Sequence, residues 1–335
     1  MKVAEIGEFG LIELLAQMVS ASRDEKSPAW QKLVLGIGDD TAAWKSAAGM
    51  ALATTDCLIQ DVHFTLGQTT WRDLGWKALA VNLSDIAAMG GTAGYALVSL
   101  GLPGDTDVEN VKELYRGMLE LGRKCGVAIV GGNTSGSRNV FISLSIVGSA
   151  GRRLLTRSGA RPGDKIAVTG YLGAAAAGFK LISNGTFPLP EDSALRQAFL
   201  KPYPRLREGA IILAGGARAA IDISDGLVAD LGHICQASLV GAHMELERVP
   251  VHPLANRLFG AEALKMALAG GEDYELLFTA SDRVIKNIRA RISCPVSILG
   301  EITSEHTGQV EVVDRQGQPF KLNKTGWEHF ATGQP

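Results

Sequence analysis

The most constraining feature of this chain is a set of carboxylates, each beside a glycine or a small residue near the end of an apolar run. The apolar segments 33–37 and 50–55 predict strands, and the acids Asp39, Asp40 and Asp56 follow directly after them. A single acid of this kind is most often a turn or cap residue. The whole set comprises Asp39, Asp40, Asp56, Asp85, Asp222, Asp225, Glu272 and Asp273.

Acids that converge without matching Lys or Arg residues repel one another, and divalent cations are the usual remedy. Oxygen ligands without a His/Cys cluster favour magnesium over zinc. Common phosphate motifs are absent: there is no GxxxxGK[ST] segment, and residues 36–41 lack the third glycine of the dinucleotide fingerprint. The 36–41 loop suits phosphates if its acids hold metal ions and those ions hold the phosphates.

Two segments with helical patterns follow these strands. Residues 76–89 are rich in Ala and Leu and predict a helix, on which Asn82 and Asp85 are three positions apart and share one face. This mostly apolar helix therefore presents a narrow polar stripe. Apolar residues recur at helical spacing over 108–125 and predict an amphipathic helix that ends near Gly126.

A chain of 335 residues predicts two domains of roughly 150 residues each. Alternation over 140–147 predicts a half-buried strand, and the small, basic segment 148–163 separates it from a new strand at 165–169. We therefore expect domains over 1–150 and 151–335. Strand and helix patterns keep alternating in the second half, which indicates α/β layers.

Charge and cysteine usage exclude several classes. The net charge is -2 and no Lys/Arg run is dense enough for a nucleic-acid or membrane patch, so neither is expected as a partner. The four cysteines lack CxxC spacing, which favours reduced thiols in the cytoplasm. The N-terminal segment lacks the pattern of a signal peptide, and no apolar run is long enough to span a bilayer.

Seven segments, in order along almost the whole chain, carry a family resemblance. They are GIGDDTA (36–42), TTDCLIQDVHF (54–64), KALAVNLSDIAAMGG (77–91), GGNTS (131–135), GDKIAVTG (163–170), AAIDISDGL (219–227) and GGEDYELLF (270–278). The chain resembles the thiamine-monophosphate kinase family, within the superfamily of aminoimidazole ribonucleotide synthetase. The resemblance implies a two-domain α/β (α+β) fold, an N-terminal sheet that forms a barrel across a homodimer, a C-terminal α/β domain and an active site between the domains.

The resemblance also implies residue roles and an activity. Metal ligands would be Asp39, Thr54, Thr55, Asp56, Asp85, Asp222 and Asp225, with Asn133 at a further metal position. ATP would contact Tyr115, Gly132, Asn133, Arg157 and Ser224, and thiamine monophosphate would contact His63, Glu272 and Trp327. The implied reaction is phosphorylation of thiamine monophosphate by ATP, with several Mg²⁺ ions, by direct transfer. Because the acceptor is a phosphate monoester, largely ionised at neutral pH, no general base is required.

Alternatives remain open at several of these residues. Without the resemblance, Tyr115 and Trp327 are equally well core or surface aromatics, a lone His63 is more often structural, and Arg157 fits a solvated linker. The family pattern GGDT reads Gly131-Gly132-Asn133-Thr134 here, so a neutral amide replaces a carboxylate. The alternative functions are another ATP-using enzyme of the superfamily and a catalytically weakened, nucleotide-binding paralogue.

Overall fold

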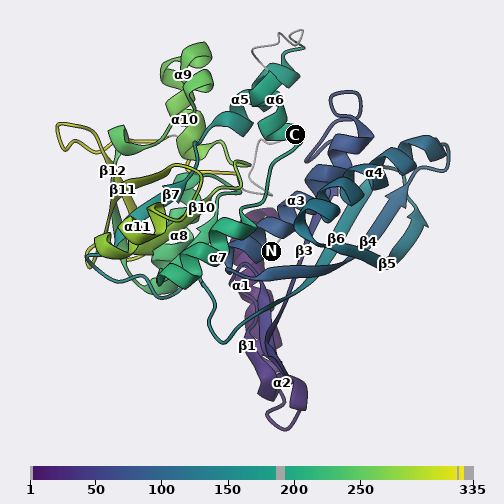
Figure 1. Ribbon diagram of the computed structural model, residues 1–335, viewed down its shortest axis with the longest axis horizontal. Helices are drawn as coiled ribbons and strands as arrows, with labels where there is room; N and C mark the ends of the chain where they lie inside the picture. Colours follow the sequence, from purple (N-terminus) through teal and green to yellow (C-terminus); the bar gives the residue numbers. More distant parts are fainter. Residues whose placement is uncertain (1–2, 186–192, 323, 328–335) are drawn as a thin grey trace.

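The computed structural model describes residues 3–185, 193–322 and 324–327, which form two mixed six-stranded sheets with helices packed on them (Figure 1). The elements of the N-terminal half are α1 (Val3–Ala21), α2 (Pro28–Lys32), β1 (Leu33–Leu35), β2 (Ala42–Ser46), β3 (Gly49–Ile59), α3 (Trp71–Ala88), β4 (Thr92–Leu102), α4 (Val108–Cys125), β5 (Ala128–Gly136) and β6 (Phe141–Ala150). The first strands of the C-terminal half and their helices are β7 (Lys165–Thr169), α5 (Ala174–Ser183), α6 (Ser193–Leu200), α7 (Leu206–Gly215), β8 (Ala219–Asp222) and α8 (Leu227–Ser238). The rest are β9 (Gly241–Glu245), a 3-10 helix (Leu246–Arg248), α9 (Pro253–Phe259), α10 (Ala261–Ala269), β10 (Leu276–Ala280), α11 (Asp282–Arg289), β11 (Val296–Thr303) and β12 (Val310–Val313).

The N-terminal sheet has the order β1-β2-β3-β6-β4-β5, and only β4 and β5 pair in parallel. Helices α3 and α4 cover one face, where Ile142, Leu144 and Ile146 of β6 are fully buried. The opposite face carries exposed apolar side chains, which we call the open-face patch. It consists of Tyr95, Leu97, Val130 and Val147.

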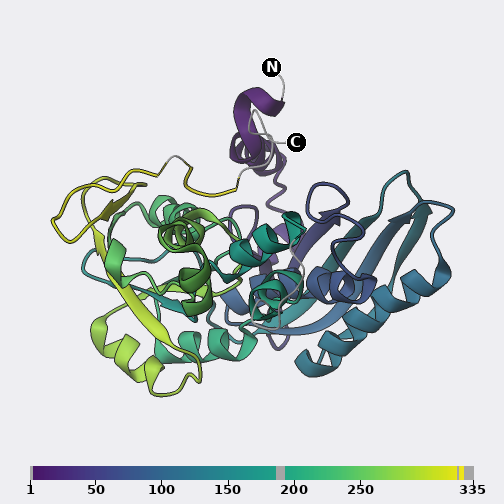
Figure 2. The same ribbon diagram turned by 90° about the horizontal axis from the view of Figure 1, so that it is seen from above.

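The C-terminal sheet has the order β12-β9-β11-β7-β10-β8, and only β12 and β9 pair in parallel. The two-domain α/β architecture predicted from the sequence is confirmed, whereas the boundary between residues 150 and 151 stays a prediction. Helix α1 stands out from the two-sheet body (Figure 2). None of the helices in the described part of the chain has the length and apolar character needed to cross a membrane.

Helix α3 lies at the centre of the fold and is buried along almost its whole length. Close backbone contacts allow this burial, since glycines occupy the crossings. A Cβ atom on Gly75 of α3 would lie 1.8 Å from the carbonyl oxygen of Leu114 on α4. A Cβ atom on Gly209 of α7 would lie 2.0 Å from the carbonyl oxygen of Ala87. The glycines therefore let α3 pack between elements of both halves.

Adding one methyl group at Gly209 tests the close crossing of α3 and α7. We expect Gly209→Ala to lower the free energy of unfolding by about 1 to 3 kcal/mol, because the helices must separate to admit the Cβ atom. Gly232→Ala in α8 is the matched control, since no atom lies within 4 Å of its Cβ position. Chemical denaturation of both variants measures the difference. Equal stability of the two variants would contradict the close packing of α3.

Candidate active site

A cavity of about 1250 Å³ lies where β3 and α3 of the N-terminal half meet the loops around β8 and β10 of the C-terminal half. Most of the site residues predicted from the sequence line it. They are Asp39, Thr55, Asp56, His63, Asp85, Arg157, Asp222, Ser224, Asp225, Glu272 and Trp327.

The polar stripe of α3 meets β3 at one wall of this cavity. The Thr54 hydroxyl donates a hydrogen bond to Asp85 Oδ2 at 2.5 Å. The backbone N–H of Asp56 donates to Asn82 Oδ1 at 2.9 Å. The shared face predicted for Asn82 and Asp85 is therefore confirmed, and both side chains point at the strand that carries the next acid.

Three carboxylates from three parts of the chain meet beside this contact. Oxygen atoms of Asp40, Asp85 and Asp222 all lie within 4.8 Å of one another, and we call this group the carboxylate cluster. Ser84 on α3 donates to Asp222 Oδ2 at 2.5 Å, so α3 orients acids of both halves. Asp40 Oδ1 accepts from Arg157 Nη2 at 2.5 Å, whereas Asp40 Oδ2 is buried and has no partner among the described residues.

The electrostatics of the cluster follow from burial and mutual repulsion. Burial, together with the charge of Asp40, raises the pKa of Asp222 to about 7. The pKa of Asp85 is raised well above its ordinary value by burial and then by the charge of Asp56. Burial raises the pKa of Asp56 and Asp40 as well, although the Arg157 guanidinium opposes the shift at Asp40. Asp39 accepts a hydrogen bond from the backbone N–H of Arg157, and burial raises its pKa to about 6.

This donor set fits a divalent cation that prefers oxygen. The cluster contains carboxylates only, one buried oxygen has no hydrogen-bond partner, and the acids raise one another's pKa. A cation of the magnesium type relieves all three conditions at once, because it supplies positive charge where protons are otherwise retained.

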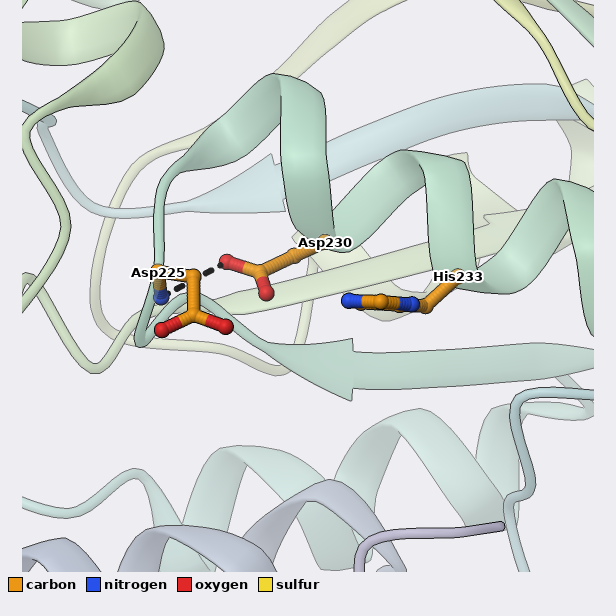
Figure 3. A group of neighbouring side chains, drawn as sticks. All are labelled: Asp225, Asp230 and His233. Carbon is orange, nitrogen blue, oxygen red and sulfur yellow. Dashed lines mark hydrogen bonds between the residues drawn. The ribbon is translucent and has the colours of Figure 1, made fainter. Parts of the chain in front are cut away.

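A second group lies at the start of α8 and in the loop before it, and contains Asp225, Asp230 and His233, whose ligand atoms also lie within 4.8 Å of one another (Figure 3). Asp230 is buried and accepts from the backbone N–H groups of Asp225 and Gly226, so it fixes the first turn of the helix. Burial lowers the pKa of His233 to about 4, and its ring lies 4.6 Å from that of Phe9 on α1. All three side chains line the cavity, and Asp225 is the one among them that the sequence interpretation selected.

Another part of the cavity lining is more apolar. It contains Phe179 and Phe199, whose ring centroids are 5.1 Å apart, and Trp327, which is 38% exposed. His63 lies nearby and its Nδ1 accepts from the backbone N–H of Ile59 at 3.0 Å. Glu272 is the acid of this wall, and its Oε2 lies 2.5 Å from Lys77 Nζ.

Three predicted ATP contacts are not among the described residues that line the cavity: Tyr115, Gly132 and Asn133. Tyr115 of α4 packs against the N-terminal core. Gly132 lies against the backbone of Val98, where a Cβ would be 1.9 Å from its carbonyl oxygen. Asn133 is exposed on the edge strand β5, three strand spacings or about 14 Å from β3. One chain does not bring these residues to the carboxylate cluster.

Several residues in or beside the cavity were missed by the sequence interpretation. Asp40 was recognised as an acid, but Asp39 was selected as the ligand, although Asp40 joins the cluster. Lys77 was missed because a buried lysine leaves no mark on a hydrophobic pattern. Helix α1 contributes Glu8, Phe9 and Ile12 among others, and its Gly7 has a positive φ of 67°, which separates two helical segments. No motif pointed to this helix.

Comparisons with known proteins agree with this geometry. Residues 38–150 match the family described as AIR synthase related protein, N-terminal domain, and residues 161–313 match its C-terminal domain. Over 334 residues the chain is 37% identical to the thiamine-monophosphate kinase of Escherichia coli strain K12, covering 97% of this chain and 99% of that protein. The chain belongs to the thiamine-monophosphate kinase family. The family's enzyme from Aquifex aeolicus is 36% identical over 337 residues, with 98% and 100% of the two chains covered.

A solved structure of the family matches the fold closely. AaThiL, complexed with AMPPCP and TMP, superposes with a TM-score of 0.84 at 35% identity, and the match covers 98% of this chain and 99% of that one. The resemblance proposed from seven motifs is therefore confirmed. The chain is a phosphotransferase of the thiamine-monophosphate kinase family.

The raised pKa values predict that cation binding depends on pH. An aspartate whose pKa rises from about 4 unfolded to about 7 folded favours the folded state at low pH, and that contribution is lost as the pH rises to 7. At pH 8 Asp222 is mostly ionised and repels the neighbouring acids, whereas at pH 5.5 a cation must displace its proton. We therefore expect Mg²⁺ to raise the melting temperature more at pH 8 than at pH 5.5.

Thermal melts at both pH values, with NaCl at matched ionic strength as the control, measure this difference. Equal shifts at the two pH values would rule out the carboxylate cluster as the cation site.

Proposed function

We propose that this chain transfers the γ-phosphoryl group of ATP to the phosphate of thiamine monophosphate and so forms thiamine diphosphate and ADP. The single observation that supports this most strongly is the division of one cavity into two walls. One wall carries the carboxylate cluster and Arg157, and the other carries aromatic rings and Glu272. The first suits cation-bound phosphates, and the second, which we call the acceptor wall, suits a ring-containing acceptor.

Residues for the phosphates follow from the first wall. We propose that Asp40, Asp85 and Asp222 hold Mg²⁺ together with Asp56, and that Asp39, Thr54, Thr55 and Asp225 complete the cation sites predicted from the sequence. Bound magnesium neutralises phosphate charge and aligns the reacting groups. Arg157 and Ser224 also line this cavity, and we propose that they contact ATP.

The acceptor needs little chemical help from the protein. Its phosphate is largely dianionic near neutral pH, since its second pKa is about 6, so a nucleophilic oxygen is already present. A bond forms between this oxygen and the γ-phosphorus while the bond from phosphorus to the β,γ-bridging oxygen breaks. No proton has to be removed, so His63, Glu272 and Trp327 act in binding and orientation.

We also propose that the chain acts as a homodimer. The open-face patch leaves four large apolar side chains exposed beside β5, whose residues are mostly exposed and unpaired along one edge. A second copy of this sheet would cover the patch and give β5 a neighbour, and it would bring another Gly132 and Asn133 toward the cavity. A cytoplasmic location stays a prediction from cysteine usage.

One observation favours a second candidate function. Asn133 provides a neutral amide where the family motif has a carboxylate. A paralogue that binds ATP and Mg²⁺ without efficient transfer would share every other feature of the cavity. Formation of thiamine diphosphate from ATP and thiamine monophosphate, followed by chromatography, separates the two functions. Tight ATP binding without product would support the paralogue.

The role of α3 in the reaction is tested at Asp85. We expect Asp85→Asn to lower kcat by about 100-fold or more, because a carboxylate that would hold the cations is lost. The fold should persist, since the substitution removes a repulsive charge at a site where the pKa of the acid is already raised. Asp105→Asn, at an exposed turn, is the control. An Asp85→Asn enzyme with the wild-type rate at saturating Mg²⁺ would exclude this assignment.

The dimer is tested at the open-face patch. Val130 is 57% exposed on β5, and Val130→Lys places a charge in the proposed contact. We expect this variant to elute as a monomer in size-exclusion chromatography with light scattering, while the wild type elutes as a dimer. Leu119→Lys on the exposed side of α4 serves as the control and should stay dimeric. A dimeric Val130→Lys protein would argue that the subunits meet elsewhere.

A further inference from the structure

Lys77 is an unusual residue for the interior of α3. It is only 3% exposed, whereas lysines are almost never fully buried unless they are paired. Its ammonium lies 2.5 Å from Glu272 Oε2 and 3.6 Å from the centroid of the Phe199 ring. One buried cation therefore contacts an acid of the loop before β10 and an aromatic ring of α6.

Glu272 is held in place from two directions. Its backbone has a positive φ of 59°, between Gly271 at 68° and Tyr274 at 49°, a conformation that side chains seldom adopt. The N–H groups of Glu272 and Tyr274 donate to the carbonyl oxygens of Ser224 and Ile223. Such backbone is retained where it positions a functional side chain. The ion pair with Lys77 then fixes the carboxylate itself.

The geometry leaves one oxygen of Glu272 for a ligand. Lys77 engages Oε2, and the side chain of Glu272, 27% exposed, lines the cavity beside Phe179 and Phe199. Its Oε1 is the acceptor that a bound molecule can reach. A charged acceptor oxygen held beside aromatic rings suits a flat heterocycle that carries an N–H or amino donor.

The charge of Lys77 also makes the two walls of the cavity differ electrostatically. Without it, Glu272 would add another uncompensated negative charge to a cavity that already holds the carboxylate cluster. With Lys77 present, the Lys77–Glu272 pair carries no net charge, and Glu272 still offers a carboxylate oxygen as a hydrogen-bond acceptor. The pair also joins α3 of the N-terminal half to a loop of the C-terminal half.

We propose that Lys77 is a positioning residue that orients Glu272 to read the amino group of the acceptor's heterocycle, and so determines which acceptor is phosphorylated. This inference rests on the proposed function and deepens it, because thiamine monophosphate carries such an amino group on its pyrimidine ring. Lys77 itself need not contact the reacting phosphates. It acts through Glu272.

The test uses the full-length protein and Lys77→Met, in which an apolar side chain of similar length fills the same space. We expect the KM for thiamine monophosphate to rise about tenfold, while kcat and the KM for ATP change by less than about threefold, since a charge-assisted hydrogen bond is lost from acceptor binding alone. The preference for thiamine monophosphate over oxythiamine monophosphate, which has an oxo group in place of the amine, should fall by a similar factor.

A double-mutant cycle separates positioning from general destabilisation. If Lys77 acts through Glu272, Lys77→Met should add little to the KM effect of Glu272→Gln. Lys201→Met is the matched control: Lys201 also lies over an aromatic ring, that of Trp76, but is not among the described residues of this cavity. This control should leave both KM values unchanged.

Two outcomes would overturn the inference while the proposed function stands: a wild-type KM for thiamine monophosphate in an active Lys77→Met enzyme, or independent effects of the two substitutions. If Lys77→Met does not fold, Lys77→Gln carries the test, because it removes the positive charge and keeps a polar side chain of similar length, and the same rise in KM is expected. A wild-type protein that neither binds nor phosphorylates thiamine monophosphate would overturn the proposed function and this inference with it.

Discussion

The structure depends on the burial of α3 between the two halves of the chain. This helix carries Lys77, Asn82, Ser84 and Asp85 within nine residues, and each of these side chains meets a different partner. Close crossings at glycine backbones bring the helix near enough to β3, β8 and the loop before β10 for all four contacts. Displacing α3 by the width of a methyl group would disturb both walls of the cavity together. Packing and chemistry are therefore linked through one element.

Repulsion among carboxylates explains why so much hydrogen bonding surrounds them. Thr54, Ser84 and Arg157 each donate to an acid of the cluster, and each donor favours the ionised form against burial. These donors are too few to compensate the charge, as the raised pKa of Asp222 indicates. The remaining imbalance is the physical basis of the cation binding that we propose for this wall. At the acceptor wall the charges are balanced, because the carboxylate of Glu272 is paired with the ammonium of Lys77.

The sequence predicted the elements better than the contacts between them. The bounds of α4 and β7 match because a capping glycine and clear periodicity define them. Helix α3 begins five residues earlier than predicted, at a Thr70 cap that the apolar pattern does not reveal. Strand β3 continues to Ile59, so Asp56 lies within the strand and not after it. Neighbouring acids such as Asp39 and Asp40 cannot be distinguished by motif, since their roles depend on which carboxylate turns inward. Lys77 illustrates the same limit, because its burial depends on Glu272, almost two hundred residues away.

Asn133, the departure from the family motif, lies apart from the carboxylate cluster of its own chain. It lies on the exposed edge strand, about 14 Å from β3 across the sheet, so an amide there leaves the repulsion within this chain unchanged. Its lack of charge matters only where β5 of one subunit approaches the cavity of the other. In the proposed homodimer, the amide would lower the negative charge at that approach. Folding of the chain and formation of its own carboxylate cluster are then independent of Asn133, while cation binding in the assembled site is not.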